Sequence, residues 1–144
     1  MFLLDTVVLS ELRKRPGRRN PHVVAWLGRR APSELFLSAV TVAEIERGIE
    51  LRRADDPAFA QALAEWLDTV LRLYDDRILP LTVAIARRWG RLAARIGNPG
   101  LDLAIAATAL EHGLTVATRD LGDFAPAGVA LIDPFAESPR RGRQ

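Results

Sequence analysis

Residues 101–120, LDLAIAATALEHGLTVATRD, restrict the kind of fold that this chain can adopt. The first ten are almost entirely leucine, isoleucine and alanine, so they predict a helix that is buried on nearly every side. Gly113 ends that helix, because glycine after the last apolar turn is a common C-terminal signal. Residues 115–118 then predict a short buried strand. A buried helix beside a buried strand indicates a sheet covered by helices.

The same alternation of strand and helix runs outward from this segment through the whole chain. Strands are predicted at residues 2–6, 35–40, 78–81 and 129–132. Helices are predicted between them, at residues 7–15, 21–27, 41–53, 57–74 and 82–96. Thr82 has the position of a helix cap. We therefore predict a single three-layer α/β/α domain with a central, mainly parallel sheet.

Length and composition fit one folded domain. The chain has 144 residues, of which 49% are hydrophobic and 26% are charged, which is typical of a folded protein. We place the domain at residues 1–134 and a basic, disordered tail at residues 135–144. No apolar run approaches the roughly 20 residues of a membrane-spanning helix. No basic segment precedes the first apolar stretch, so we expect a cytoplasmic protein without membrane contact.

Charge gives only weak evidence about the partner. The formal net charge is +2, and it falls to −1 when the three arginines of residues 138–144 are left out. Basic side chains gather at residues 13–19 and, with helical spacing, at residues 87, 91 and 95. Each group is explained most simply as a solvated helix face. Together they could also hold a phosphate backbone.

Four acids stand where the functional crevice of a parallel sheet is expected. In such sheets the crevice lies outside the carboxyl ends of the strands. Asp5 ends the first strand, and Glu44 is one turn into the helix after the second strand. Asp102 opens the apolar helix, and Asp120 follows the strand at residues 115–118. All four can meet at one end of the sheet.

These acids also have structural explanations. Asp5 could accept hydrogen bonds at a helix start, and Thr41 and Glu44 have the spacing of a capping box. Asp120 and Asp123 could make local turns. Taken one at a time, Glu44 and Asp120 are better explained in this way.

The structural explanation is weakest for Asp102, which could complement the dipole of the helix that it opens. That helix is predicted to be buried nearly all round. An ionised acid in such surroundings costs several kcal/mol unless a cation or hydrogen-bond donors compensate it. A bound metal ion would explain Asp102.

The ligand types in the sequence indicate a hard metal ion. The chain has no cysteine and only two histidines, and both, His22 and His112, stand at predicted helix ends away from the acids. Carboxylates alone suit Mg²⁺ or Mn²⁺ rather than zinc. One or two such ions, with a metal-activated water, make hydrolysis of a phosphodiester possible without a nucleophile from the protein.

Five blocks of the sequence together resemble a known family. They are LLDTVVLSE (3–11), LSAVTVAEIERGIE (37–50), RILPLTVAIARRWGRLAAR (77–95), LDLAIAATALEHGLTVATRD (101–120) and DF (123–124). In order and spacing they resemble the VapC-type PIN-domain ribonuclease toxins of type II toxin–antitoxin systems, particularly the FitB-like branch. The resemblance extends from Met1 to about Pro134.

The resemblance implies a catalytic site that binds Mg²⁺ or Mn²⁺. Its catalytic, metal-binding acids correspond to Asp5, Glu44, Asp102 and Asp120, the four already selected by their positions. The resemblance also implies three supporting groups. Thr6 and Thr118 would orient carboxylates or water, and Asp123 would add a carboxylate through water.

The resemblance further implies partners. They are an RNA substrate, a second copy of the chain in a homodimer, and a VapB-like antitoxin whose C-terminal segment lies in a groove and blocks the site. We therefore predict a metal-dependent endoribonuclease toxin of a toxin–antitoxin pair.

Two positions depart from the family pattern. Val7 stands where the family usually has asparagine, and Thr82 stands where many relatives have aspartate. Val7 keeps an alternative open, a catalytically weak PIN module that binds RNA or protein.

Two other enzyme classes that use an aspartate after the first strand fit less well. A haloacid-dehalogenase-type phosphatase requires a second aspartate at position 7, where this chain has valine. A phosphorylated receiver domain requires a lysine after a late strand, and the only lysine is Lys14.

Overall fold

A five-stranded parallel sheet forms the centre of the computed structural model, which describes residues 1–97 and 100–136. Its strands lie in the order β3-β2-β1-β4-β5, and each neighbouring pair is parallel. Their bounds are Phe2–Leu4 (β1), Leu35–Ser38 (β2), Ile78–Leu79 (β3), Thr115–Ala117 (β4) and Leu131–Ile132 (β5). The order reverses at β1, so the crevice for a ligand is expected between the ends of β1 and β4.

Seven α-helices in the described residues surround this sheet. They are α1 (Thr6–Glu11), α2 (Pro21–Gly28), α3 (Ala39–Arg53), α4 (Pro57–Leu73), α5 (Val83–Ile96), α6 (Leu101–His112) and α7 (Leu121–Phe124). Single turns of 3₁₀ helix lie at Pro16–Arg18, Pro32–Glu34, Asp75–Arg77 and Ala125–Ala127. The predicted three-layer α/β architecture with a parallel sheet is confirmed.

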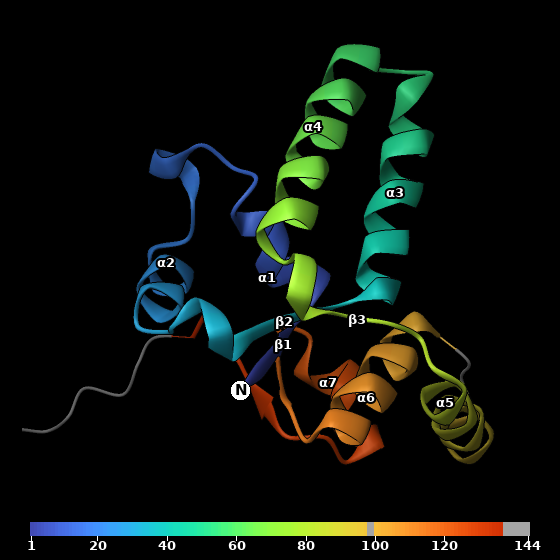
Figure 1. Ribbon diagram of the computed structural model, residues 1–144. Helices are drawn as coiled ribbons and strands as arrows, with labels where there is room; N and C mark the ends of the chain where they lie inside the picture. The colour runs from blue at the N-terminus through green and yellow to red at the C-terminus, as the bar shows by residue number, and fades with distance from the viewer. Residues whose placement is uncertain (98–99, 137–144) are drawn as a thin grey trace, which may run out of the picture.

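The two faces of the sheet carry separate apolar layers because successive strand residues point to opposite sides. Leu3 packs with α5, α6 and α7, whereas Leu4 packs with α1, α2 and the end of α4. Figure 1 shows α5, α6 and α7 below the sheet and α1, α3 and α4 above it. The predicted buried helix is α6, in which every residue from Leu103 to Ala109 is buried.

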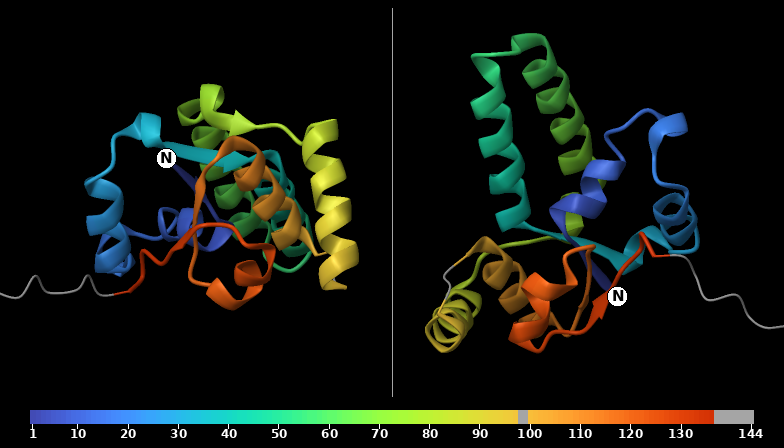
Figure 2. Two further views of the ribbon diagram at one scale, coloured as in Figure 1. Left: turned by 90° about the horizontal axis from the view of Figure 1, so that it is seen from below. Right: turned by 180° about the vertical axis from the view of Figure 1, so that it is seen from behind.

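The helices α3 and α4 form a hairpin that projects from the sheet, as Figures 1 and 2 show. A small apolar cluster around Ile49, Ala60 and Leu67 holds the two helices together. Because the hairpin stands on the end of β2, it makes a wall beside the carboxyl ends of the strands.

Helix caps decide where the strands end. The predicted strand at residues 2–6 stops at Leu4, because the Asp5 side chain accepts the N–H of Thr6 and caps α1. The strand at residues 35–40 stops at Ser38, whose hydroxyl accepts the N–H of Val40. The structural explanation of Thr41 and Glu44 as a capping box is therefore wrong, because Ser38 caps α3 and Thr41 lies inside the helix.

Other local signals are confirmed. The hydroxyl of Thr82 accepts the N–H of Ile85 at the start of α5. Gly113 follows α6 with a φ of 65°, a backbone conformation that favours glycine. The remaining predicted strands are each one or two residues too long, as expected when boundaries are inferred from apolar runs.

The start of the predicted tail packs against the domain. The guanidinium of Arg119 lies 3.8 Å from the centroid of the Phe135 ring. Residues 137–144, which make up most of the predicted tail, lie outside the described residues. None of the described helices combines the length and apolar character needed to cross a membrane.

Phe124 anchors α7, and its side chain is fully buried. We expect Phe124→Ala to lower the free energy of unfolding by about 3–5 kcal/mol, because it removes a large core side chain and leaves a cavity. Leu121→Ala, on the same helix but 41% exposed, is the control and should cost about 1 kcal/mol or less. Urea unfolding measures both, and equal losses would contradict this account of α7.

Candidate active site

The first acid of the site is buried at the point where the strand order reverses. Asp5 follows β1, is only 5% exposed, and its backbone N–H donates to the carbonyl of Ala117 on β4. One carboxylate oxygen accepts the Thr6 N–H at 2.8 Å. The other accepts the hydroxyl of Thr118 at 2.9 Å. The Asp5 carboxyl group is therefore held in one orientation by both neighbouring elements.

Thr118 links this acid to the loop after β4. Its fully buried hydroxyl donates to Asp5 and accepts the backbone N–H of Asp120 at 2.9 Å. A single hydroxyl group thus sets the position of Asp5 and of the backbone that carries Asp120.

Glu44 faces the same place from α3. Its carboxylate accepts a long hydrogen bond of 3.4 Å from the hydroxyl of Thr6. Burial raises the pKa of Glu44, and the negative charges of Asp5 and Asp102 raise it further. The side chain of Glu44 therefore belongs to the same electrostatic cluster as these two acids.

Asp102 is half-buried in the first turn of α6. Burial raises the pKa of Asp102 most, and the negative charges of Asp123 and Asp120 raise it further. Asp102 and Asp123 also line one small pocket, together with Gly100 and Gly122. Asp123, expected only as a supporting group, therefore lies beside Asp102.

The exposed acids complete the cluster on its outer side. Asp120 and Asp123 lie at the surface, at the start and near the end of α7. Asp120 also raises the pKa of Asp5. Among the four acids selected from the sequence, Asp5 thus interacts electrostatically with each of the other three.

The donor set fits a hard divalent cation. All the clustered ligands are carboxylates, whereas His22 and His112 are exposed on α2 and at the far end of α6. Oxygen ligands of this kind are those that Mg²⁺ and Mn²⁺ prefer. Within residues 1–97 and 100–136, no three acidic or histidine side chains already stand in metal-binding geometry. Without a cation between them, the negative charges of these carboxylates repel one another.

Val7 contributes to one of the two apolar layers. It is half-buried and packs into the apolar layer formed by α1, α2 and α4. The departure from the family pattern at this position therefore replaces a polar side chain with one that joins the core.

This chain belongs to the PIN-domain family, whose model matches residues 2–127. It is 40% identical to Toxin FitB of Neisseria gonorrhoeae, over 94% of this chain and 99% of that protein. It is 37% identical to VapC ribonuclease Y4jK of Sinorhizobium fredii, over 94% and 98%. A solved structure of FitAB bound to an IR36 DNA fragment matches with a TM-score of 0.82 and 36% identity, over 98% of this chain and all of that one. The resemblance to FitB-like and VapC-type toxins is confirmed.

Sequence reasoning missed a set of side chains beside the acids. Arg52 on α3 and Phe59 on α4 contact each other across the hairpin, with the Arg52 guanidinium 5.2 Å from the ring centroid. The basic run at residues 13–19 indicates that Arg13 could bind an anion, but no sequence pattern connects Arg13 with Phe59. Only the packing of the hairpin against α1 brings these residues together.

The buried carboxyl group of Asp5 predicts an unusual dependence of stability on pH. Burial raises its pKa from 3.8 to about 6, and the hydrogen bonds from Thr118 and Thr6 only partly oppose this rise. A carboxyl group with a raised folded-state pKa binds its proton more tightly in the folded chain. Its contribution to stability is therefore complete below about pH 4 and is lost as the pH rises to about 6.

We expect Asp5→Asn to be more stable than the unchanged chain above about pH 6, by at most about 3 kcal/mol, and to lose this advantage near pH 4. Urea unfolding across this pH range, in EDTA, measures the difference. Asp68→Asn, which removes an exposed carboxylate from α4, is the matched control. A difference between Asp5→Asn and the unchanged chain that stays constant with pH would contradict the raised pKa.

Proposed function

We propose that this protein is a divalent-metal-dependent endoribonuclease and the toxin of a VapBC-type toxin–antitoxin pair. The observation that carries the proposal is the buried, doubly hydrogen-bonded Asp5 with Glu44 and Asp102 beside it. The similarity to proteins named VapC ribonuclease and Toxin FitB supports it.

The proposed metal ligands are Asp5, Glu44, Asp102 and Asp120, with Asp123 acting through water. A bound Mg²⁺ or Mn²⁺ lowers the pKa of a water molecule and offsets the charge of the scissile phosphate. Thr118 and the Thr6 N–H orient Asp5, so the carboxylate needs little reorganisation to bind. Because a ligand carboxyl group must lose its proton, cation binding should weaken below about pH 6.

The position of the histidines favours hydrolysis by water over attack by the 2′-hydroxyl of RNA. Attack by the 2′-hydroxyl normally requires general acid and base groups that titrate near neutral pH. His22 and His112 are exposed on other parts of the surface. The expected products carry a 5′-phosphate and a 3′-hydroxyl.

We further propose that the protein acts in the cytoplasm, forms a homodimer and pairs with a VapB-like antitoxin. The similar FitAB structure bound to DNA supports an assembly of two kinds of chain. An antitoxin segment that covers the acids would keep the nuclease inactive until the antitoxin is removed.

The first test is cleavage of a purified RNA with Mg²⁺ or Mn²⁺. We expect cleavage to stop in EDTA and to fall at least about 100-fold in Asp5→Asn and Asp102→Asn, because each loses a ligand charge. The rate of RNA cleavage should fall by about 10–100-fold in Thr118→Val, because this change removes the hydroxyl that orients Asp5. Asp68→Asn is the control. Activity that persists in EDTA, or products with a 2′,3′-cyclic phosphate, would reject the mechanism.

The second test separates the toxin from the other candidate function, a catalytically weak PIN module, which Val7 favours. We expect induced expression without a partner to arrest growth, and Asp5→Asn and Asp102→Asn at matched protein levels to relieve the arrest. If the folded, abundant chain causes no arrest but Val7→Asn does, the weak binding module is the better description.

A further inference from the structure

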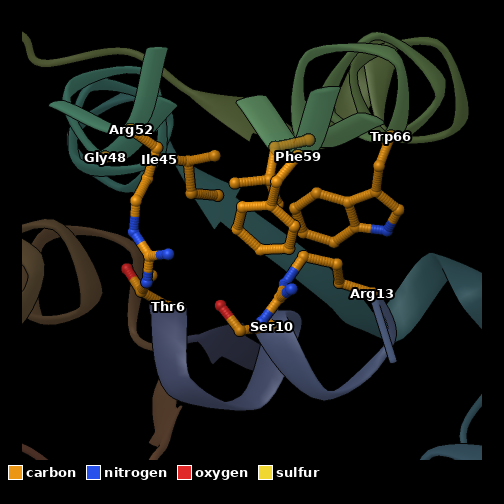
Figure 3. A pocket seen from close by; sticks show the side chains of 9 residues that line it. Thr6, Ser10, Arg13, Ile45, Gly48, Arg52, Phe59 and Trp66 are labelled. Carbon is orange, nitrogen blue, oxygen red and sulfur yellow. The ribbon is translucent and has the colours of Figure 1, made fainter. Parts of the chain in front are cut away.

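A groove lies between α1 and the α3–α4 hairpin, as Figure 3 shows. Thr6 on α1 lines the groove, and the same residue donates to Glu44 of the acid cluster. Ile45 on α3 and Trp66 on α4 contribute apolar surface to its wall. Thr6 therefore connects the groove with Glu44 of the proposed active site.

Two guanidinium groups are held against one aromatic ring in this groove. Arg13 of the segment after α1 lies 5.3 Å from the centroid of Phe59, and Arg52 of α3 lies 5.2 Å from it. Figure 3 shows both arginine side chains pointing into the groove from opposite walls. Contact with an aromatic ring restrains an arginine without neutralising its charge.

Arg13 and Arg52 differ in their charge partners from the basic residue that follows each of them. Lys14 pairs with Glu11 at 2.6 Å, and Arg53 pairs with Glu50 at 2.9 Å. In the part of the chain that the structure describes, neither Arg13 nor Arg52 has a carboxylate partner within ion-pair distance. Both arginines are exposed, so their charges are available to an anion from outside.

A single RNA strand matches this combination better than an acidic peptide does. Grooves that hold single-stranded nucleic acid combine positive charge for the phosphates with aromatic surface for the bases. Planar guanidinium groups suit phosphate oxygens in particular. An acidic peptide would also pair with the arginines, but its acidic side chains have no bases to stack on the aromatic surface that Phe59 and Trp66 provide.

The arginines stand beside the reacting centre rather than within it. Arg13 and Arg52 line the groove, and none of the proposed metal-binding acids does. A phosphate that these arginines hold is therefore a neighbour of the one held at the acids. Arg13 and Arg52 would position the strand and take no part in bond cleavage.

We propose that Arg13 and Arg52, restrained by Phe59, bind phosphates of the RNA strand adjacent to the scissile one and so direct the substrate along this groove. This inference rests on the proposed function, because it assumes that RNA is the substrate. To the proposed function it adds the path that the RNA strand takes over the surface and the residues that hold the RNA there.

The direct test is the salt dependence of RNA binding. A labelled single-stranded RNA of about 12 nucleotides is titrated with the Asp102→Asn chain in Mg²⁺, so that the probe is not cut, at several KCl concentrations. Each of Arg13→Gln and Arg52→Gln should lower the slope of log K against log[KCl] by about 0.7, and the double variant by about 1.4, because each removes one phosphate contact.

Two variants of α3 provide matched controls. Arg53→Gln removes a charge from the next residue of the same helix, one that Glu50 already neutralises, and should leave the slope nearly unchanged. Arg52→Lys retains the charge and should restore most of the slope lost in Arg52→Gln. A slope that Arg52→Gln and Arg53→Gln lower equally, or RNA binding without salt dependence, would overturn the proposal.

Cleavage kinetics distinguish this inference from the proposed function. In the chain with Asp102 intact, the double variant Arg13→Gln/Arg52→Gln should raise KM for the oligonucleotide at least about tenfold, with a smaller effect on kcat. A dinucleotide, which is too short to reach the groove, should show a much smaller rise in KM. Unchanged KM values for both substrates would overturn the inference alone.

The remaining outcomes also have clear meanings. If the unchanged chain cleaves neither substrate, the proposed function fails, and the salt dependence of binding still decides whether the groove holds RNA. If the double variant binds RNA normally but loses affinity for a protein partner, the groove is a protein-docking surface and the inference is wrong.

Discussion

The carboxyl group of Asp5, buried where three elements meet, is the constraint on which the site depends. It ends β1, caps α1 and accepts the hydroxyl of Thr118 after β4. Burial raises its pKa to about 6, so the charged form is destabilised unless a cation is near. The fold places this group where the strand order reverses, which is also where a ligand can enter a parallel sheet. The geometry of the site and its electrostatic cost therefore have the same origin.

The apolar layers make this arrangement possible. Helix α6 is rich in alanine and is buried along most of its length, so it can pack closely against the sheet and bring Asp102 to the strand ends. The buried side chain of Phe124 holds α7, which carries Asp123, against the core. A group of mutually repelling acids lowers the stability of the chain, and burial of apolar side chains on both faces of the sheet offsets that loss.

Thr6 links the acidic side chains of the proposed site to the arginines of the groove. The acids occupy the end of the sheet, and the restrained guanidinium groups of Arg13 and Arg52 occupy the groove beside it. The acid cluster and the groove both depend on α3, which carries Glu44 near the sheet and Arg52 in the projecting hairpin. A change in the position of this hairpin would therefore alter the acid cluster and the groove together. An antitoxin segment that covers the acids would lie close to this groove.

The order of elements and most caps could be inferred from residues close together in the chain, as could the placement of Asp5 and Asp120 after strands. The apolar runs of β1 and α6, the cap at Thr82 and the stop at Gly113 are signals of this kind, because periodicity and capping act over a few residues. The end of β2 at Ser38, the position of Asp123 beside Asp102, and the meeting of Arg13, Arg52 and Phe59 were decided by the tertiary structure. These depend on competition between neighbouring caps and on the packing of helices that are distant in sequence, and no local pattern encodes either.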